Sequence, residues 1–122
     1  MKLSHLAGFA VAAATLASVA TPAKAAAPAE FQVCAACHST KPGVIKIGPS
    51  LAGVVGRKAG TMPGFKYSAA MKKAGWIWDV KKLTAYIDDP QKVVPGNRMP
   101  FFGTHNMKTA HTVAEYLATL KK

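Results

Sequence analysis

The sequence predicts an all-α fold with long loops and no β-sheet. Apolar residues with the i, i+3, i+4, i+7 spacing of a buried helix face occur near the end of the chain, at Val113, Tyr116, Leu117 and Leu120. No stretch of useful length alternates apolar and polar residues, as a half-buried strand does. The chain has 122 residues, which is the size of a single domain.

The first 25 residues are predicted to be a secretory leader. Lys2 provides a short basic start, and residues 6–20 form a run without charge. Ala23 and Ala25 then place small side chains at the two positions that a signal peptidase reads, so we expect cleavage after Ala25. The run is too short and too rich in alanine for a membrane span, and no second run follows. We therefore expect an exported, periplasmic protein without a transmembrane span.

The mature domain, residues 26–122, is strongly basic. The whole chain has 16 lysines and arginines against 5 acidic residues, a formal charge of +11. Loss of Lys2 and Lys24 with the leader leaves 97 residues and a charge of +9. Nucleic acid is the usual partner of such charge, but an exported protein rarely meets it. We expect a monomer that docks transiently on an acidic protein or a membrane surface, and no nucleic acid.

The first part of the mature domain is predicted to be a short helix followed by a long loop. Residues 29–38 are expected to be helical, with Phe31 facing inward. Residues 39–66 contain six glycines and three prolines in 28 positions, a density that favours turns and breaks helices. A structureless segment of this length is uncommon in a compact domain. We expect the loop to wrap around a rigid object.

Helices resume after the loop. Ser68 can cap a short helix that Gly75 ends. Asp79 can cap a second helix with an apolar stripe on one face. The stripe consists of Val80, Leu83 and Ile87, with Tyr86 beside it.

Two further helices complete the predicted fold. Asp89-Pro90 places an N-cap before a proline at the first helical position, and Pro95-Gly96 ends this short helix. Residues 97–103 form another loop. The last helix is expected over residues 106–120, and it carries the apolar face described above.

Both cysteines of the chain fall in one motif, Cys34-Ala35-Ala36-Cys37-His38. Two thiols three positions apart on a helix face the same side, so they can form thioethers with both vinyl groups of one porphyrin. The adjacent histidine can then ligate the iron. A haem would also complete a core that contains only four leucines and four isoleucines after the leader.

Three other interpretations of the motif are less favoured. A thiol–disulfide oxidoreductase carries such a motif after a strand of a βαβ unit, which this chain lacks. A zinc site needs four ligands, and beyond the motif the mature chain has only two more histidines, His105 and His111, six positions apart, and no further cysteine. A structural disulfide across a two-residue gap would close a strained ring.

Beyond this motif, five further segments form a characteristic series that spans nearly all of the mature chain. They are Gly48-Pro49-Ser50-Leu51, Gly56-Arg57-Lys58, Gly64-Phe65-Lys66-Tyr67-Ser68, Trp78, and Pro95-Gly96-Asn97-Arg98-Met99 followed by Phe101. In order and spacing they resemble the class I c-type cytochromes of mitochondrial type and of purple bacteria. The resemblance implies the cytochrome c fold, with three main helices, short helices and long loops around one covalent haem.

The resemblance implies a role for each matched residue. Cys34 and Cys37 would carry the thioethers of one haem c. His38 would be the proximal iron ligand, with its other ring nitrogen bonded to the carbonyl of Pro49. Met99 would be the distal iron ligand.

Further cofactor-binding residues follow from the same resemblance. The groups expected to hydrogen-bond or neutralise a buried haem propionate are Arg57, Tyr67 and Trp78, although the two aromatic residues could also be core residues that need any polar partner. Tyr86 matches the tyrosine that packs beside the distal methionine, and Phe101 the aromatic residue near the exposed haem edge. Asn97 replaces a family threonine but can still donate a hydrogen bond.

The residues themselves also favour Met99 as the distal ligand. It lies in a loop with proline and glycine before it and Phe101-Phe102 after it, which suits a lid over a crevice. The methionines expected to have ordinary packing roles are Met62, Met71 and Met107. Met71 stands where the family often has an asparagine near a buried water, so it should dry the pocket. His105 and His111 are alternative ligands, but His111 falls off the buried face of its helix, which disfavours it.

The chain departs from the family at several other positions. Val33 and Gln91 stand where lysines are often found at the docking interface. The contact of the first helix with the last is expected to depend on Phe31 against Tyr116 and Leu117. Basic residues still expected around the haem edge are Lys41, Lys46, Lys92 and Arg98.

Ligation by histidine and methionine predicts electron transfer rather than enzymatic catalysis. Both axial positions would be filled, so weak peroxidase-like activity would require displacement of Met99. A thioether ligand and a buried haem both raise the reduction potential. We expect a one-electron carrier between respiratory, photosynthetic or dehydrogenase complexes, steered by basic side chains. A peroxidase-like enzyme with a labile Met99, or a metal-binding module on a basic surface, are the alternatives.

Overall fold

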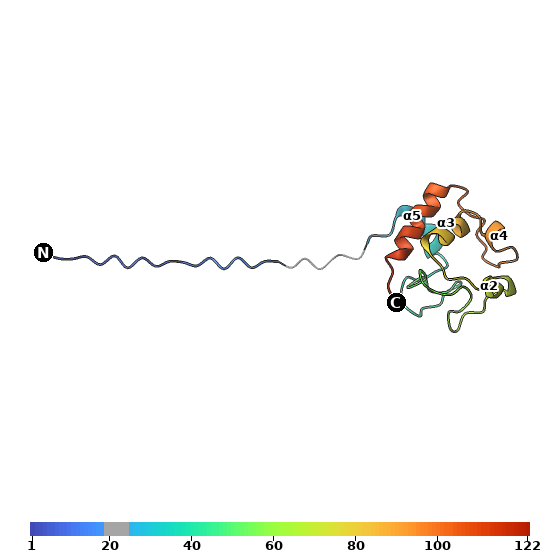
Figure 1. Ribbon diagram of the computed structural model, residues 1–122, viewed down its shortest axis with the longest axis horizontal. Helices are drawn as coiled ribbons and strands as arrows, with labels where there is room; N and C mark the ends of the chain where they lie inside the picture. Colours follow the sequence, from blue (N-terminus) through green and yellow to red (C-terminus); the bar gives the residue numbers. More distant parts are fainter. Residues whose placement is uncertain (19–24) are drawn as a thin grey trace.

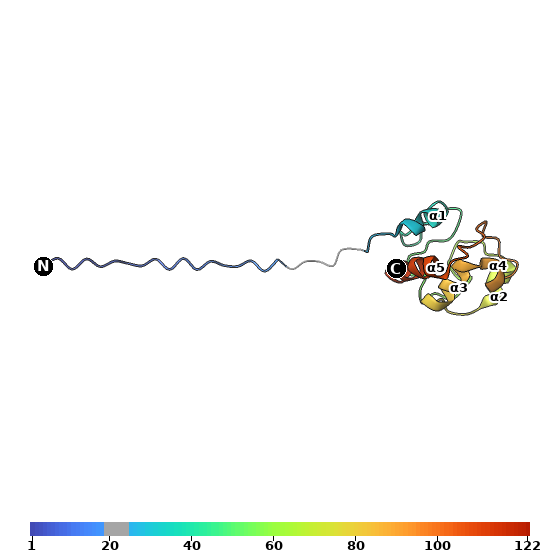
Figure 2. The ribbon, with the colours of Figure 1, turned by 90° about the horizontal axis from the view of Figure 1, so that it is seen from above.

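The computed structural model describes residues 1–18 and 25–122 of the chain. The first 18 residues contain no helix or strand, and their side chains are exposed, so they add nothing to the core. They extend away from the folded part as a single thread (Figure 1 and Figure 2). Residues 19–24 lie outside the described residues, and with them Ala23 and Lys24 of the expected leader. The leader and its cleavage site stay predictions.

The folded part of the chain is helical. Its elements are, in order, the 3-10 helix η1 (Ala29–Phe31) and the α-helices α1 (Gln32–Ala35), α2 (Ala69–Ala74), α3 (Val80–Asp88), α4 (Pro90–Val93) and α5 (Met107–Ala118). The described residues form no strand, and Lys58 and Ile77 make only an isolated bridge. No helix in these ranges is long and apolar enough to cross a membrane. The predicted all-α fold is confirmed.

Four helices begin where the sequence places an N-cap. Before α2, α3, α4 and α5 stand Ser68, Asp79, Asp89 and Asn106, respectively. In each case the side chain accepts a hydrogen bond of 2.7–3.2 Å from the backbone N–H of the third helical residue. Gly75 ends α2 with a φ of +69°, as a left-handed cap requires.

The helix predicted over residues 29–38 is wrong in its last three positions. The N–H groups of Cys37 and His38 both donate to the carbonyl of Cys34, at 3.1 and 2.9 Å, in a tight turn. The carbonyl of Cys37 in turn accepts from the N–H of Gly48, at 2.8 Å. Because the long loop takes this acceptor, the chain leaves the helix within the Cys-x-x-Cys-His motif.

Helices α3 and α5 pack side by side at the centre of the fold (Figure 1 and Figure 2). The N-terminal η1 reaches α5, where the buried ring of Phe31 meets Tyr116 edge to face, with ring centroids 5.0 Å apart. Leu117 belongs to the same buried cluster. The predicted contact between the first and last helices is confirmed.

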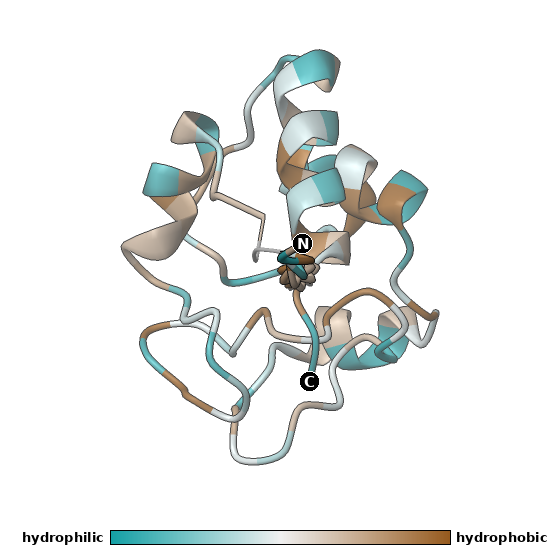
Figure 3. Ribbon diagram, turned by 90° about the vertical axis from the view of Figure 1, so that its left-hand side faces the viewer, coloured by the Kyte–Doolittle hydropathy of each residue, from teal (hydrophilic) through white to brown (hydrophobic). Residues whose placement is uncertain are grey.

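The long loop over residues 39–66 is held to the rest of the domain by backbone hydrogen bonds. The N–H of Gly53 donates to Leu120 at 3.0 Å, and the N–H of Gly56 donates to Trp78 at 2.8 Å. Figure 3 shows hydrophobic residues in the loops as well as in the helices. The loop therefore contributes to the interior, and Val54 within it is buried.

Candidate functional site

A cavity of about 710 Å³ lies inside the helical fold. All eleven residues that the sequence predicts for the site line this one cavity: Cys34, Cys37, His38, Pro49, Arg57, Tyr67, Trp78, Tyr86, Asn97, Met99 and Phe101. They come from α1 and the turn after it, the long loop and the residues between it and α2, the segment between α2 and α3, α3 itself, and the loop before α5. Residues more than sixty positions apart in the chain therefore share one site.

Most of the apolar residues that line the cavity were not predicted from the sequence to belong to the site. Leu83 and Ile87 of α3 and Val113 and Leu117 of α5 line it, although their helical spacing identified them only as core. The aliphatic residues that line it from outside the helical stripes are Val33, Ile47, Leu51 and Val54. No periodicity marks these positions, because α1, which carries Val33, is only four residues long, and the other three lie in the long irregular loop.

His38 is fixed on one side of the cavity. Its Nδ1 lies 2.7 Å from the carbonyl oxygen of Pro49, so the hydrogen bond expected from the sequence is present. Since a carbonyl only accepts, Nδ1 carries the proton, and the lone pair of Nε2 stays available for a metal. Any side chain at Gly48 would collide with the imidazole ring, so glycine is required there for the histidine to keep this position.

The imidazole of His38 is held in its neutral form. Burial lowers the pKa of His38, and the hydrogen bond to Pro49 only partly opposes this effect. The positive charges of Lys46 and Arg57 lower the pKa further. A neutral imidazole is the form that ligates a metal ion.

Cys34 and Cys37 are half-buried free thiols on the wall of the cavity. Burial raises the pKa of Cys34, and the neighbouring Cys37 raises it further. A reactive redox cysteine has the opposite shift, toward the thiolate. Among the described residues, no three His, Cys, Asp or Glu side chains gather as a metal site. The raised pKa of Cys34 disfavours the oxidoreductase interpretation.

Met99 lines the cavity with its sulfur near Tyr86. The Tyr86 hydroxyl lies 4.0 Å from Met99 Sδ, as expected for a tyrosine packed beside this methionine. Its neighbour Asn97 is buried and accepts a hydrogen bond from the Met99 N–H at 3.0 Å. The amide nitrogen of Asn97 donates to the carbonyls of Pro90 and Val94, at 3.0 and 2.9 Å. Asn97 therefore uses its donors to hold the loop that carries Met99.

The other methionines differ from one another. Met62 is buried and does not line the cavity, as expected for a packing residue. Met71 lines the cavity, so its apolar side chain does face the site. The packing role expected for Met107 is wrong, because its side chain is 56% exposed at the start of α5. His111 is exposed and pairs with Glu115, which agrees with its exclusion as a ligand.

The three residues expected to serve a propionate have different surroundings. Arg57 donates to the carbonyl of Ala52 at 2.7 Å, which fixes its guanidinium at the cavity. The Tyr67 hydroxyl accepts from the N–H of Met62 at 3.2 Å, so its own proton remains available to a further acceptor. Trp78 is buried and packs against Tyr86, with ring centroids 5.2 Å apart.

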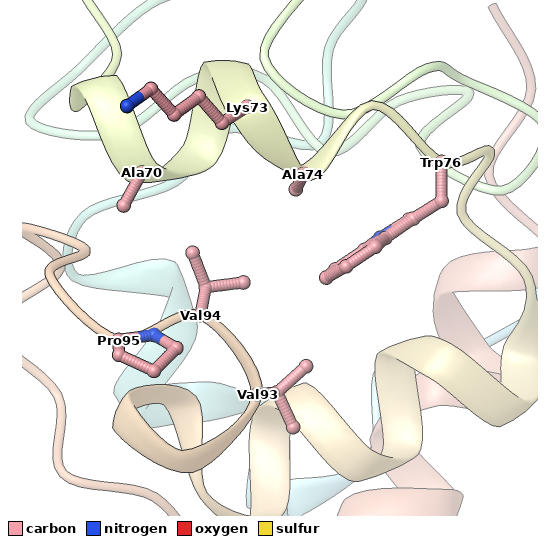
Figure 4. Close-up of a pocket in the computed structure, with 7 residues that line it drawn as sticks. All are labelled: Ala70, Lys73, Ala74, Trp76, Val93, Val94 and Pro95. Atoms are coloured by element: carbon pink, nitrogen blue, oxygen red, sulfur yellow. The ribbon is translucent and has the colours of Figure 1, made fainter.

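A second pocket, of about 490 Å³, lies between α2 and the end of α4 (Figure 4). Ala70, Trp76, Val94 and Pro95 form its apolar walls, and Lys73 is its one charged side chain. The buried indole N–H of Trp76 has no hydrogen-bond partner among the described residues. None of the eleven site residues lines this pocket, so it belongs to a different part of the surface.

The residues of the large cavity fit a haem. Its walls are mostly apolar, as a porphyrin requires, and they include two thiols placed for thioether bonds. A neutral imidazole and a thioether line the same space, which is the ligand pair of many c-type haems. Fold and site together define a c-type cytochrome.

Comparisons with known proteins agree with this class. No family model matches the chain. It is 54% identical over 95 residues to cytochrome c2 iso-2 of Magnetospirillum molischianum, covering 78% of this chain and 98% of that protein. It is 44% identical to cytochrome c2 of Rhodopila globiformis over 89 residues, or 73% of this chain and 84% of that one.

A solved structure gives the same result. Cytochrome cH from Methylobacterium extorquens superposes with a TM-score of 0.69 and 41% identity, covering 74% of this chain and 91% of that one. The chain belongs to the class I c-type cytochromes, among the cytochromes c2. It is an electron-transfer protein with covalent haem c, rather than an enzyme.

The buried hydroxyl of Tyr86 predicts a pH dependence of stability. Burial raises the pKa of Tyr86 to about 12, from 10.0, so the folded protein keeps this proton longer than the unfolded chain. Stability should fall as pH rises above about 10, because only the unfolded chain gains from ionisation. Tyr86→Phe should remove about 1.4 kcal/mol of this loss at about pH 11.

Urea denaturation of the haem-loaded protein at about pH 8 and about pH 11 measures this effect. Tyr116→Phe is the matched control, because Tyr116 is only half-buried, and it should follow the unaltered protein. Equal losses of stability in both variants would contradict the prediction.

Proposed function

We propose that this cytochrome is a one-electron carrier whose haem is bound by Cys34 and Cys37 and ligated by His38 and Met99. The observation that carries this proposal is the convergence of both thiols, the imidazole and the thioether on one apolar cavity. When bound, the haem supplies a reversible one-electron couple. The protein sets the reduction potential of that couple and the surface through which redox partners exchange electrons with it.

The residues of the cavity favour a high reduction potential. The neutral thioether of Met99 adds no negative charge beside the iron, and the apolar walls disfavour the extra charge of the oxidised state. The hydrogen bond from His38 to Pro49 keeps the imidazole in one orientation, so little rearrangement accompanies the change of charge. Arg57 and the free proton of Tyr67 are available to acidic groups at the edge of the cavity.

The rim of the cavity is the proposed docking surface for redox partners. Ile47 lines the cavity and is 71% exposed, so the cavity reaches the surface there. Lys46, next to it, donates to the carbonyl of Ala35 at 2.8 Å, and Arg98 donates to the carbonyl of Lys66 at 3.0 Å. These basic groups stand beside an apolar opening, an arrangement that suits transient docking of acidic proteins.

We also propose that the carrier works in the periplasm, between respiratory, photosynthetic or dehydrogenase complexes. The support is the leader pattern in the sequence and the exposure of all side chains in residues 1–18. Cleavage then leaves residues 26–122 as one domain.

Intact mass spectrometry of the exported protein tests this processing site. The mature chain should begin at Ala26, because Ala23 and Ala25 are the small residues that the peptidase recognises. Ala23→Arg should block processing, whereas Ala27→Ser, two positions beyond the site, should leave it unchanged. A mature chain that begins elsewhere would show that the site is misplaced.

Met99→Ala tests the ligand assignment. Loss of the thioether should abolish the red absorption band of sulfur-ligated ferric haem and lower the reduction potential by on the order of 0.1 V, within the range that axial ligands span. The control is Met107→Ala, because Met107 lies on the surface of α5. It should keep both properties. Survival of the band in Met99→Ala would exclude Met99 as the ligand.

The docking surface predicts how electron transfer responds to salt. Stopped-flow oxidation by ferricyanide, an anion, should slow several-fold between ~10 mM and ~0.3 M salt, whereas oxidation by a cationic cobalt complex should accelerate. Lys46→Gln should slow ferricyanide more than Lys121→Gln, because Lys46 stands at the rim and Lys121 near the C-terminus. Oxidation rates that do not change with salt concentration, or equal effects of both variants, would disprove electrostatic steering at the rim of the cavity.

A further inference from the structure

The side chain of Gln91 spans the turn that leads to Met99. Its Nε2 donates to the carbonyl of Asn97 at 3.0 Å, and its Oε1 accepts from the N–H of Gly96 at 3.1 Å. One carboxamide therefore pairs with a donor and an acceptor on neighbouring residues, as a strand would in a sheet. We call these two contacts the Gln91 clamp.

The base of the clamp is fixed. Gln91 is the second residue of α4, which begins at the fully buried Pro90. The carboxylate of Asp89 caps this helix by accepting from the N–H of Lys92 at 3.2 Å. A side chain that projects from such an anchored turn can restrain the backbone it binds.

The clamp completes the hydrogen bonding of the turn. The N–H of Asn97 donates to Val94 at 3.1 Å, and the Met99 N–H donates to the side chain of Asn97. Among the described residues, Gln91 is the one hydrogen-bond partner of both the Gly96 N–H and the Asn97 carbonyl. Gly96 itself has a φ of +88°, a conformation that glycine adopts without strain but does not enforce, so the shape of the turn depends on its hydrogen bonds.

A lysine at position 91 could not form the clamp. An ammonium group only donates, so it has no atom to accept the Gly96 N–H. A carboxamide has both functions in one plane. The clamp is therefore a property of the glutamine at position 91 and not of the backbone alone.

We propose that Gln91 is a positioning residue for Met99, which holds the turn closed and so keeps the sulfur in the cavity. This inference rests on the proposed role of Met99 as the distal ligand. An external ligand can take the place of Met99 only when the turn opens, and opening breaks both bonds of the clamp. Loss of the clamp raises the population of the open turn, and the apparent affinity for the external ligand rises with it.

Titration of the oxidised, haem-loaded protein with imidazole tests the proposal. Loss of the red absorption band reports displacement of the sulfur. The apparent imidazole dissociation constant should fall by about tenfold in Gln91→Ala, as expected for two broken hydrogen bonds. Lys92→Ala is the matched control, since Lys92 is the next exposed residue of α4 and its side chain makes no bond to the turn. It should stay within about twofold of the unaltered protein.

A second variant and a second measurement separate the clamp from general destabilisation. Gln91→Glu keeps the size of the side chain but turns a carboxylate oxygen toward the Asn97 carbonyl, so it should also weaken the hold on the turn. Amide hydrogen exchange of the reduced protein should become faster at Gly96 in both Gln91 variants, and remain unchanged at the buried Leu117 of α5.

The outcomes are distinct. Equal imidazole affinities and equal Gly96 exchange in Gln91→Ala and Lys92→Ala would overturn the clamp and leave the proposed function intact. A red band that is absent from the unaltered oxidised protein would exclude sulfur ligation, and would overturn both proposals.

Discussion

The hydrogen bond between His38 and Pro49 is the interaction on which the rest of the site depends. It joins the Cys-x-x-Cys-His motif to the long loop and sets which ring nitrogen faces the cavity. Two neighbouring features support it: the Gly48 N–H donates to the Cys37 carbonyl, and the missing side chain of Gly48 leaves room for the ring. The irregular segment thus supports the proposed iron ligand, through its glycine at position 48 and its proline at position 49.

The two sides of the cavity are built on different principles. On the His38 side, one short hydrogen bond and steric contact with the backbone fix a ring. On the Met99 side, a flexible thioether is held indirectly, through carboxamides that satisfy the backbone around it. A thioether has no strong hydrogen-bonding group of its own, so only its loop can be restrained. Each of the two proposed ligands therefore receives the kind of support that its chemistry allows.

Much of this structure could be predicted from the sequence, and the failures have physical causes. The N-caps were predicted correctly from the short polar side chains that precede Pro90 and the starts of other helices, because capping depends on local geometry. All eleven residues that the sequence predicted for the site line the cavity, but most of its apolar wall was not predicted. The early end of the first helix could not be predicted, since its acceptor, Cys37, bonds to a distant Gly48. The contacts of Gln91 could not be predicted either, because they depend on the shape of a turn that forms only in the folded chain.

The partial burial of Cys34 and Cys37 on the cavity wall has a consequence for biogenesis. In the folded chain the two thiols face an interior assembled from distant segments, so attachment of the cofactor is easiest before those segments close. Cys34 is only nine positions beyond the expected cleavage site, so in the proposed export it would be among the first residues of the mature domain to emerge. Maturation would then run from one end of the chain: the motif is loaded first, and α3, the turn with Met99 and α5 arrive later to enclose what has already been bound.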